Sequence, residues 1–319
     1  MDNTTRRGAR LLSIAAVTGT ALALTGATPA QAGSSVGALV AGRTLYVVGT
    51  NAGDTVSLSP DPEAGVLRVD SGPGGTVRAF RTSGFDRVVV SLLGGDDTFA
   101  VSSAAVPFPG QLSVSGGRGA DQIQGGSGND VLTGNAGDDR LLGGNGVDTL
   151  VGNDGDDIVN GQRGDDLELL GAGDDVAAWL PGEGSDDVAG ASGTDRLDFT
   201  GANGPEQFAL FGTPGQAVLT RVQGQIRMET TSVEQVALQP LGGGDEITVD
   251  GTNRAERVAV SAERGDVLVD GPLVALRIAG AEAADRLLVR TFGGDDEVRV
   301  SDAAAALLGI GVELGSGQS

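Results

Sequence analysis

The sequence predicts an all-β protein in which tight turns and short strands repeat along the chain. Six consecutive nine-residue units run from Gly116 to Leu169, and each has glycine at places 1 and 4 and aspartate at place 6. Around them, a longer module of about fifty residues recurs and alternates apolar with polar residues between glycine-rich turns. Aromatic residues make up only 3% of the chain, too few for an ordinary globular core. A stacked solenoid, which buries small side chains coil by coil, needs fewer.

Residues 1–32 have the features of a secretory signal peptide. Arginines precede an apolar run over residues 11–24, and the segment ends in the small residues Ala30-Gln31-Ala32. The pair Arg6-Arg7 is not followed by the apolar residues of a twin-arginine signal, so ordinary export is favoured. We therefore expect a secreted, extracellular protein that starts near Gly33. No long apolar segment follows the leader, so no membrane insertion is expected.

Three copies of the longer module surround the nonapeptides. The string GTNAGDTVSL at Gly49 returns in altered form at Gly201 and Gly251. We expect an N-terminal β module at 33–111, the array at 112–198, and two more β modules at 198–249 and 250–300. They are interpreted as degenerate solenoid coils, or as small β units that cover exposed strand edges at the ends of the array. A disordered tail is expected at 301–319, because the chain ends before a second array begins.

Within the array, each nonapeptide supplies one turn and one strand. Glycine permits a tight turn, and an apolar residue at place 8, such as Leu132 or Leu141, suits a strand with one inward face. If turns alternate between two edges, the aspartates of every second unit stack roughly 4.8 Å apart, and each unscreened pair costs on the order of 3 kcal/mol. Cations are therefore needed between the turns. Calcium suits a mixture of carboxylates and carbonyls, whereas zinc prefers nitrogen and sulfur ligands.

These units resemble the RTX, or haemolysin-type, calcium-binding repeats found in secreted proteins, including actinobacterial ones with similar modules. The resemblance implies a parallel β-roll, a β-solenoid with ions between successive turns. It implies carboxylate ligands at Asp121, Asp130, Asp139, Asp148, Asp157, Asp166 and Asp175, and turn-forming, carbonyl-donating glycines at Gly119, Gly128, Gly137, Gly146 and Gly155. The pattern departs from the family where Glu168 occupies place 8, Leu170 replaces the first glycine, and Trp179 and Leu180 interrupt the phase.

The intact same-edge pairs of aspartates predict about four to six calcium ions that are structural, so that folding and binding are one event. Extracellular calcium modules typically bind at about 10⁻⁴ to 10⁻³ M. The modules also contain acidic pairs after glycines, namely Asp96-Asp97, Asp245-Glu246 and Asp295-Asp296. Whether these pairs bind metal or are only acidic turns is left open by the sequence.

Composition narrows the functional classes. A formal charge of −22 disfavours nucleic acid as a partner. The chain has no histidine and no cysteine, which removes imidazole-based catalysis and disulfides, so no enzymatic activity is expected. Two other functions stay open. One is a calcium-dependent adhesion protein that contacts an extracellular polymer or a cell surface, recognisable by calcium-dependent retention on cells. The other is an accessory partner of a separate secreted hydrolase, recognisable by co-purification.

Overall fold

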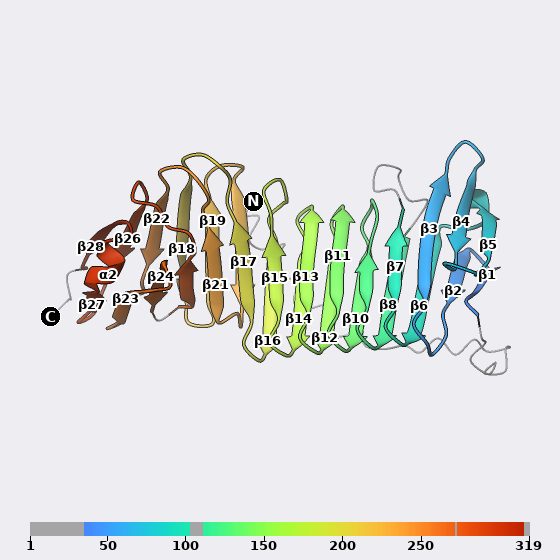
Figure 1. Cartoon of the computed structure of the whole chain (residues 1–319), viewed down its shortest axis with the longest axis horizontal. Coiled ribbons are helices and arrows are strands. Elements are labelled where there is room, and N and C mark those ends of the chain that lie inside the picture. Colours follow the sequence, from blue (N-terminus) through green and yellow to red (C-terminus); the bar gives the residue numbers. More distant parts are fainter. Residues whose placement is uncertain (1–34, 103–110, 272, 316–319) are drawn as a thin grey trace. The chain divides into compact units, whose positions relative to one another are not determined.

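The computed structural model of the chain describes residues 35–102, 111–271 and 273–315. In the compact unit of residues 34–319, the strands form two sheets of fourteen strands each. Successive strands of the array alternate between these sheets, so that every second strand is a neighbour within one sheet (Figure 1). The predicted leader at 1–32 lies outside the described residues.

The two sheets are named A and B. Sheet A contains, in spatial order, β1 (Gly37–Ala41), β2 (Thr44–Val48), β6 (Arg87–Gly94), β8 (Gln111–Arg118), β10 (Val131–Ala136), β12 (Thr149–Asp154), β14 (Leu167–Ala172), β16 (Asp187–Ser192), β20 (Ile226–Thr231), β19 (Gln216–Arg221), β18 (Gln207–Thr213), β22 (Glu246–Asp250), β26 (Arg286–Arg290) and β28 (Gly309–Glu313). Sheet B contains β27 (Glu297–Val300), β23 (Arg257–Glu263), β24 (Asp266–Asp270), β25 (Ala275–Ile278), β21 (Gln235–Gln239), β17 (Arg196–Thr200), β15 (Val176–Trp179), β13 (Ile158–Arg163), β11 (Arg140–Asn145), β9 (Gln122–Gln124), β7 (Thr98–Val101), β3 (Thr55–Asp61), β4 (Val66–Asp70) and β5 (Val77–Arg81). Helical turns within the described residues are limited to the 3-10 turn η1 (Thr82–Gly84) and α2 (Asp302–Ala305).

The array is a parallel β-roll, as predicted. Leu132 of β10 pairs with Leu150 of β12, and Leu141 of β11 pairs with Val159 of β13, all in parallel register. Each pair is separated by eighteen residues, which is two nonapeptides. One complete coil of the roll therefore consists of two turns and two strands, one strand in each sheet.

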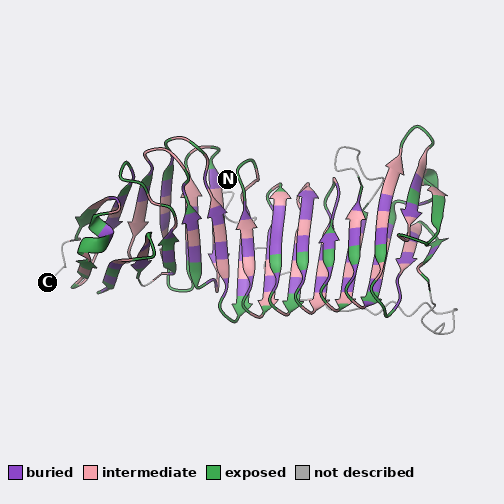
Figure 2. Cartoon of the chain, viewed as in Figure 1, coloured by how far each residue is buried: buried purple, intermediate pink, exposed green. Residues whose placement is uncertain are grey.

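Place 8 of the nonapeptide builds the core between the sheets. These side chains form two facing ladders, and the buried positions alternate with more exposed ones along each strand (Figure 2). The ladder of sheet A contains Val114, Leu132, Leu150 and Val188, and that of sheet B contains Ile123, Leu141, Val159, Ala177 and Leu197. Burial of one such aliphatic side chain contributes about 1.5–3 kcal/mol, so the ladders favour stacking of every coil on the next.

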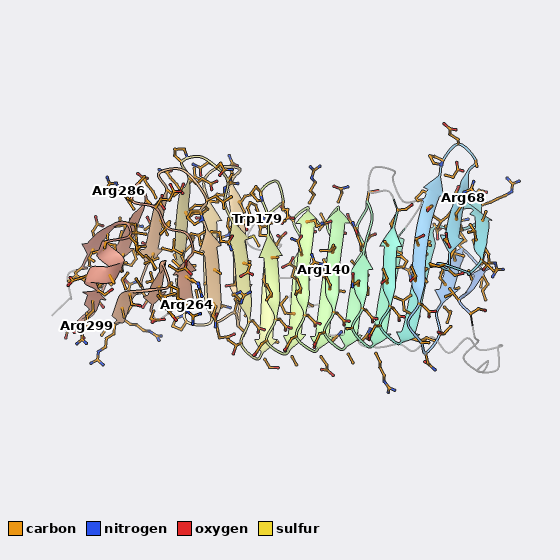
Figure 3. The ribbon with its side chains drawn as sticks, viewed as in Figure 1. Arg68, Arg140, Trp179, Arg264, Arg286 and Arg299 are labelled. Carbon is orange, nitrogen blue, oxygen red and sulfur yellow. The ribbon has the colours of Figure 1, made fainter. Side chains whose placement is uncertain are left out.

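The phase break predicted at Trp179 and Leu180 lengthens one coil. Leu167 pairs with Asp187, a separation of twenty residues instead of eighteen. Trp179, labelled in Figure 3, lies at the end of β15 and is fully buried. Its ring stacks on that of Phe199 of β17, with ring centroids 4.1 Å apart and an interplanar angle of 3°. The inserted residues thus give the roll a large aromatic contact near its C-terminal end.

The longer modules continue the two sheets on both sides of the array. Strand β6 pairs in parallel with β8, and β17 pairs in parallel with β21. Each module adds an antiparallel excursion to its coil: β3–β4–β5, β18–β19–β20 and β23–β24–β25. The modules are therefore degenerate coils with hairpins, one of the two forms considered from the sequence.

The segment 301–319 differs from its prediction. Instead of a disordered tail, it contains helix α2, whose N-cap Ser301 accepts a hydrogen bond from the amide of Ala304, and strand β28. Strand β28 pairs in parallel with β26, and Leu308 is buried in the core. The disorder prediction is wrong here because the segment extends sheet A without needing an aspartate turn. Residues 316–319 lie outside the described part.

Candidate metal centres

The turns of the array require glycine at place 4. Gly155 has φ of +130°, and a Cβ atom on it would lie 2.2 Å from the carbonyl oxygen of Gly137 in the preceding turn. Gly137 has φ of +125° and the same close approach to Gly119. Any larger residue would meet both a disfavoured backbone conformation and a backbone atom. The place-4 glycines named from the sequence are thus the residues on which successive turns stack.

The turns form two edges of the roll. Edge A is made by the turns that follow strands of sheet A, and edge B by those that follow β9, β11, β13 and β15. Strands β11, β13 and β15 point upward in Figure 1, toward edge B. Edge A holds Asp121, Asp139, Asp157 and Asp175, and edge B holds Asp130, Asp148 and Asp166. All seven side chains are at most 2% exposed.

Along each edge, the backbone amide of one aspartate donates a hydrogen bond to the carboxylate of the next. The amide of Asp121 donates to Oδ1 of Asp139 over 2.8 Å, and that of Asp130 donates to Oδ1 of Asp148 over 2.8 Å. The five predicted same-edge pairs are all in this contact: Asp121 with Asp139, Asp139 with Asp157, Asp157 with Asp175, Asp130 with Asp148, and Asp148 with Asp166. This contact fixes the direction of each carboxylate.

One oxygen of every carboxylate in these columns has no hydrogen-bond partner among the described residues. These buried oxygens are Oδ2 of Asp121, Asp139, Asp148, Asp157, Asp166 and Asp175, and Oδ1 of Asp130. A buried acceptor without a partner costs about 1–3 kcal/mol, and more when the group is charged. A repeated row of such oxygens fits a row of hard cations.

Backbone carbonyl groups of the next turn lie beside these oxygens. The position that a Cβ atom would take on Gly143 is 2.5 Å from Oδ2 of Asp148 and 2.5 Å from the carbonyl oxygen of Gly161. At Gly152, the corresponding distances are 2.2 Å to Oδ2 of Asp157 and 2.4 Å to the carbonyl oxygen of Leu170. The place-1 carbonyl groups are therefore candidate ligands, although only place-4 glycines were named individually from the sequence. Leu170 replaces the glycine at place 1 of its unit, but its backbone carbonyl still lies beside Oδ2 of Asp157.

The raised pKa values of these aspartates are those expected of carboxylates that need a cation beside them. Burial raises the pKa of Asp139, Asp148 and Asp157 to about 7, and that of Asp130 and Asp166 to about 6. Desolvation is the largest cause in each case, and neighbouring carboxylates add to it at Asp139, Asp148 and Asp157. Without a cation, the folded array holds its carboxylates more readily as neutral acids than the unfolded chain does.

This arrangement predicts an inverted pH dependence for the calcium-free chain. The folded pKa values exceed the ordinary value of 3.8, so protonation favours the folded state, and this stabilisation is lost as pH rises from about 4 to 7. In chelator, we expect the β-sheet signal of the array, which is lost at pH 7, to increase as pH is lowered from 7 to 5. A circular dichroism signal that stays the same or falls over this interval would contradict the burial of these aspartates.

The same contact continues beyond the nonapeptides chosen from the sequence. The amide of Asp97 donates to Oδ1 of Asp121 over 2.8 Å, the amide of Asp175 to Asp195 over 3.1 Å, and the amide of Asp166 to Asp186 over 2.9 Å. Burial raises the pKa of Asp97 to about 7. The sequence does not decide whether the pair Asp96-Asp97 binds metal, because acidic turns between strands are common. In the structure, Leu93 takes place 2 of this turn at a φ of +81°.

In the module that follows the array, a guanidinium group lies beside a turn carboxylate. Glu206 corresponds to place 6 of a turn, and its amide donates to Oδ1 of Asp245 over 2.8 Å. The side chain of Arg221, on the hairpin excursion, forms a buried ion pair with Glu206. In the last module, Asp296 accepts the amide of Glu256, and Oδ2 of Asp296 has no partner in the described part of the chain. The modules thus keep the turn but vary how its charge is compensated.

Two further findings limit the type of site. Within the described ranges, no three carboxylates converge on one point closely enough to hold a metal ion by themselves. A site between two turns must therefore combine two aspartates with backbone carbonyl groups, a donor set that calcium accepts. In addition, no helix of the described residues is long and apolar enough to cross a membrane.

Comparison with known families identifies the repeats. The RTX calcium-binding nonapeptide repeat (4 copies) matches residues 115–150 and 142–177, the segment that contains the two aspartate columns. No curated protein and no solved structure matches the chain.

Proposed function

We propose that the protein is exported and binds several structural calcium ions, each between two successive turns of one edge. The match of the RTX calcium-binding nonapeptide repeat to residues 115–150 and 142–177 supports this proposal. The proposed ligands are the seven place-6 aspartates from Asp121 to Asp175 and carbonyl groups of the turn glycines. One observation supports this most directly. Each aspartate has one oxygen fixed by the amide of the preceding turn or by its own turn, and one buried oxygen without a partner among the described residues.

The chain's own residues prepare the sites only when the coils are stacked. The amide of one turn orients the carboxylate of the next, and the apolar ladders exclude water beneath the edges. An unfolded chain cannot bring these oxygens together, so calcium binding and folding of the array are coupled. The bound ion supplies the positive charge that offsets repulsion along each column. At low calcium concentration, the array is then unfolded, and it folds where calcium is near millimolar.

The number of ions follows from the number of turn pairs. Five pairs give the expectation of about four to six ions, and the contacts of Asp97, Asp186 and Asp195 bring the candidate turn pairs to eight. Isothermal titration of the full chain with calcium tests this, and we expect at least four ions per chain. Magnesium is the control, because its strict octahedral geometry suits these sites poorly. Binding of a single calcium ion, or equal binding of magnesium, would refute the proposal.

We further propose a non-catalytic role. The carboxylates recur in equivalent surroundings along each edge, so none has the distinct environment that an acid or base catalyst requires. The chain also has no histidine or cysteine to serve as a nucleophile or base.

A further inference from the structure

The core ladder of sheet A contains one carboxylate. Glu168 of β14 lies in register between Leu150 and Val188 and is 1% exposed. A charge buried among aliphatic side chains costs several kcal/mol unless it is paired and hydrogen-bonded. Glu168 therefore needs compensation from its surroundings.

Glu168 contacts sheet B across the core, at a place where the pairing of sheet B is interrupted. Strands β11 and β13 remain in register as far as Asn145 and Arg163, whereas β13 and β15 pair only at Ile158 and Val159 before the coil is lengthened. In this gap, Oε1 of Glu168 accepts the amide of Gly161 over 2.6 Å. This hydrogen bond satisfies Oε1, but the other oxygen, Oε2, is buried with no partner in the described structure.

Other acidic and polar groups surround this gap. Glu183 accepts the amide of Leu180 over 2.6 Å and the side-chain amide of Asn160 over 3.4 Å. The buried Oδ1 of Asn160 and Oδ2 of Asp166 have no partners among the described residues. Burial, and then the nearby Asp186, raise the pKa of Glu168 well above its ordinary value, with further contributions from Asp166 and Glu183. Glu168 thus has three acidic neighbours, and its own Oε2 and the Oδ2 of Asp166 are buried without a partner in the described part of the chain.

We propose that Glu168, Asp166, Asp186 and Glu183 together hold one calcium ion at the C-terminal end of edge B. This site rests on the proposed calcium function, but its ligand set differs from the other turn pairs, which offer two carboxylates each. Among the described residues, no three carboxylates converge on one point. Binding of the ion therefore requires the long side chains of the two glutamates to rotate toward it. Affinity rises with the number of charged ligands. The ion therefore binds here first and orders the lengthened coil.

Trp179 provides a selective probe of this site. It is the single tryptophan of the chain, and its Nε1 donates to the carbonyl oxygen of Gly184 over 2.8 Å, in the turn that contains Asp186. Terbium(III) replaces calcium at oxygen-rich sites, and excitation of Trp179 sensitises only a nearby terbium ion. We expect sensitised emission from the full chain to saturate before the other sites fill.

Substitution Glu168→Gln tests the ligand role. Glutamine keeps the shape and the acceptor for the amide of Gly161 but removes the charge, so the terbium concentration at half-maximal emission should rise about tenfold. Glu63→Gln, at an exposed position in a distant loop, is the matched control and should leave the titration unchanged. If Glu168 serves only as a hydrogen-bond acceptor, or holds a proton, Glu168→Gln will titrate like the unaltered chain, and the proposal is overturned.

Two measurements separate the possible failures. Circular dichroism in calcium verifies that Glu168→Gln is folded; if it is not, Glu183→Gln replaces it, with the same expected loss of terbium affinity. Calorimetric counting of calcium addresses the rest of the array. Normal calcium binding with an unchanged terbium titration overturns only this site, whereas absence of calcium binding overturns the proposed function as well.

Discussion

Removal of calcium is expected to abolish most of the β-sheet signal of residues 112–198. Without the ions, each column brings several buried carboxylates into line, and each close pair costs on the order of 3 kcal/mol. Natural domains are stable by only about 5–15 kcal/mol, so a few uncompensated pairs are enough to unfold the array. Far-ultraviolet circular dichroism of the chain in chelator, followed by calcium titration at pH 7, will show a cooperative gain of β signal near millimolar calcium.

Two controls accompany the calcium titration. Magnesium at the same concentrations should restore little of the signal. The double variant Asp139→Ala with Asp148→Ala, which removes one carboxylate from each edge, should require a higher calcium concentration for the same gain. A spectrum that is complete in chelator and insensitive to calcium would contradict ion-driven folding. The flanking coils would then be sufficient to order the array, and the adhesion function would become the better explanation.

Gly143→Ala is expected to remove one calcium site and to destabilise the calcium-bound array by about 3 kcal/mol. The added Cβ would lie 2.5 Å from both Oδ2 of Asp148 and the carbonyl oxygen of Gly161, the two groups proposed to share an ion. The backbone of Gly143 is outside the left-handed region, so alanine meets no backbone strain there. Calorimetry should count one fewer calcium ion, and the midpoint of urea unfolding in calcium should fall.

Gly84→Ala is the matched control for this substitution. A Cβ on Gly84 meets no atom within 4 Å, and its φ is likewise outside the left-handed region. We expect an unchanged ion count and unfolding midpoint. If Gly143→Ala behaves in the same way, the space beside Asp148 is not the position of an ion, and the carbonyl groups at place 1 are not ligands.

The array could be predicted from sequence because its signals are local. Place 6 and place 8 recur every nine residues, and the eighteen-residue coil follows from alternation between two edges. The same logic identified Trp179 and Leu180 as a break, and the coil there is indeed two residues longer. Where one residue type repeats at one spacing, stacking converts the pattern directly into contacts.

Other features depend on contacts that no spacing reveals. Arg221 reaches Glu206 only because a hairpin excursion folds back onto the roll. The sequence does not decide whether Asp96-Asp97 binds metal, because acidic turns between strands are common. The contact between the amide of Asp97 and Oδ1 of Asp121 arises only when the two turns stack. The C-terminal strand β28 was missed because its stability derives from pairing with β26 rather than from any motif of its own.

The amide-to-carboxylate contacts point in one direction along each edge, from an earlier turn to a later one. In a one-dimensional stack with such nearest-neighbour coupling, a defect in the middle divides one long run into two short runs, whereas a defect at an end only shortens it. Natural variation should therefore be tolerated at the ends and eliminated in the middle. The departures at Glu168 and Leu170 lie toward the C-terminal end of the nonapeptide array, so a break there leaves the longer run of coils intact.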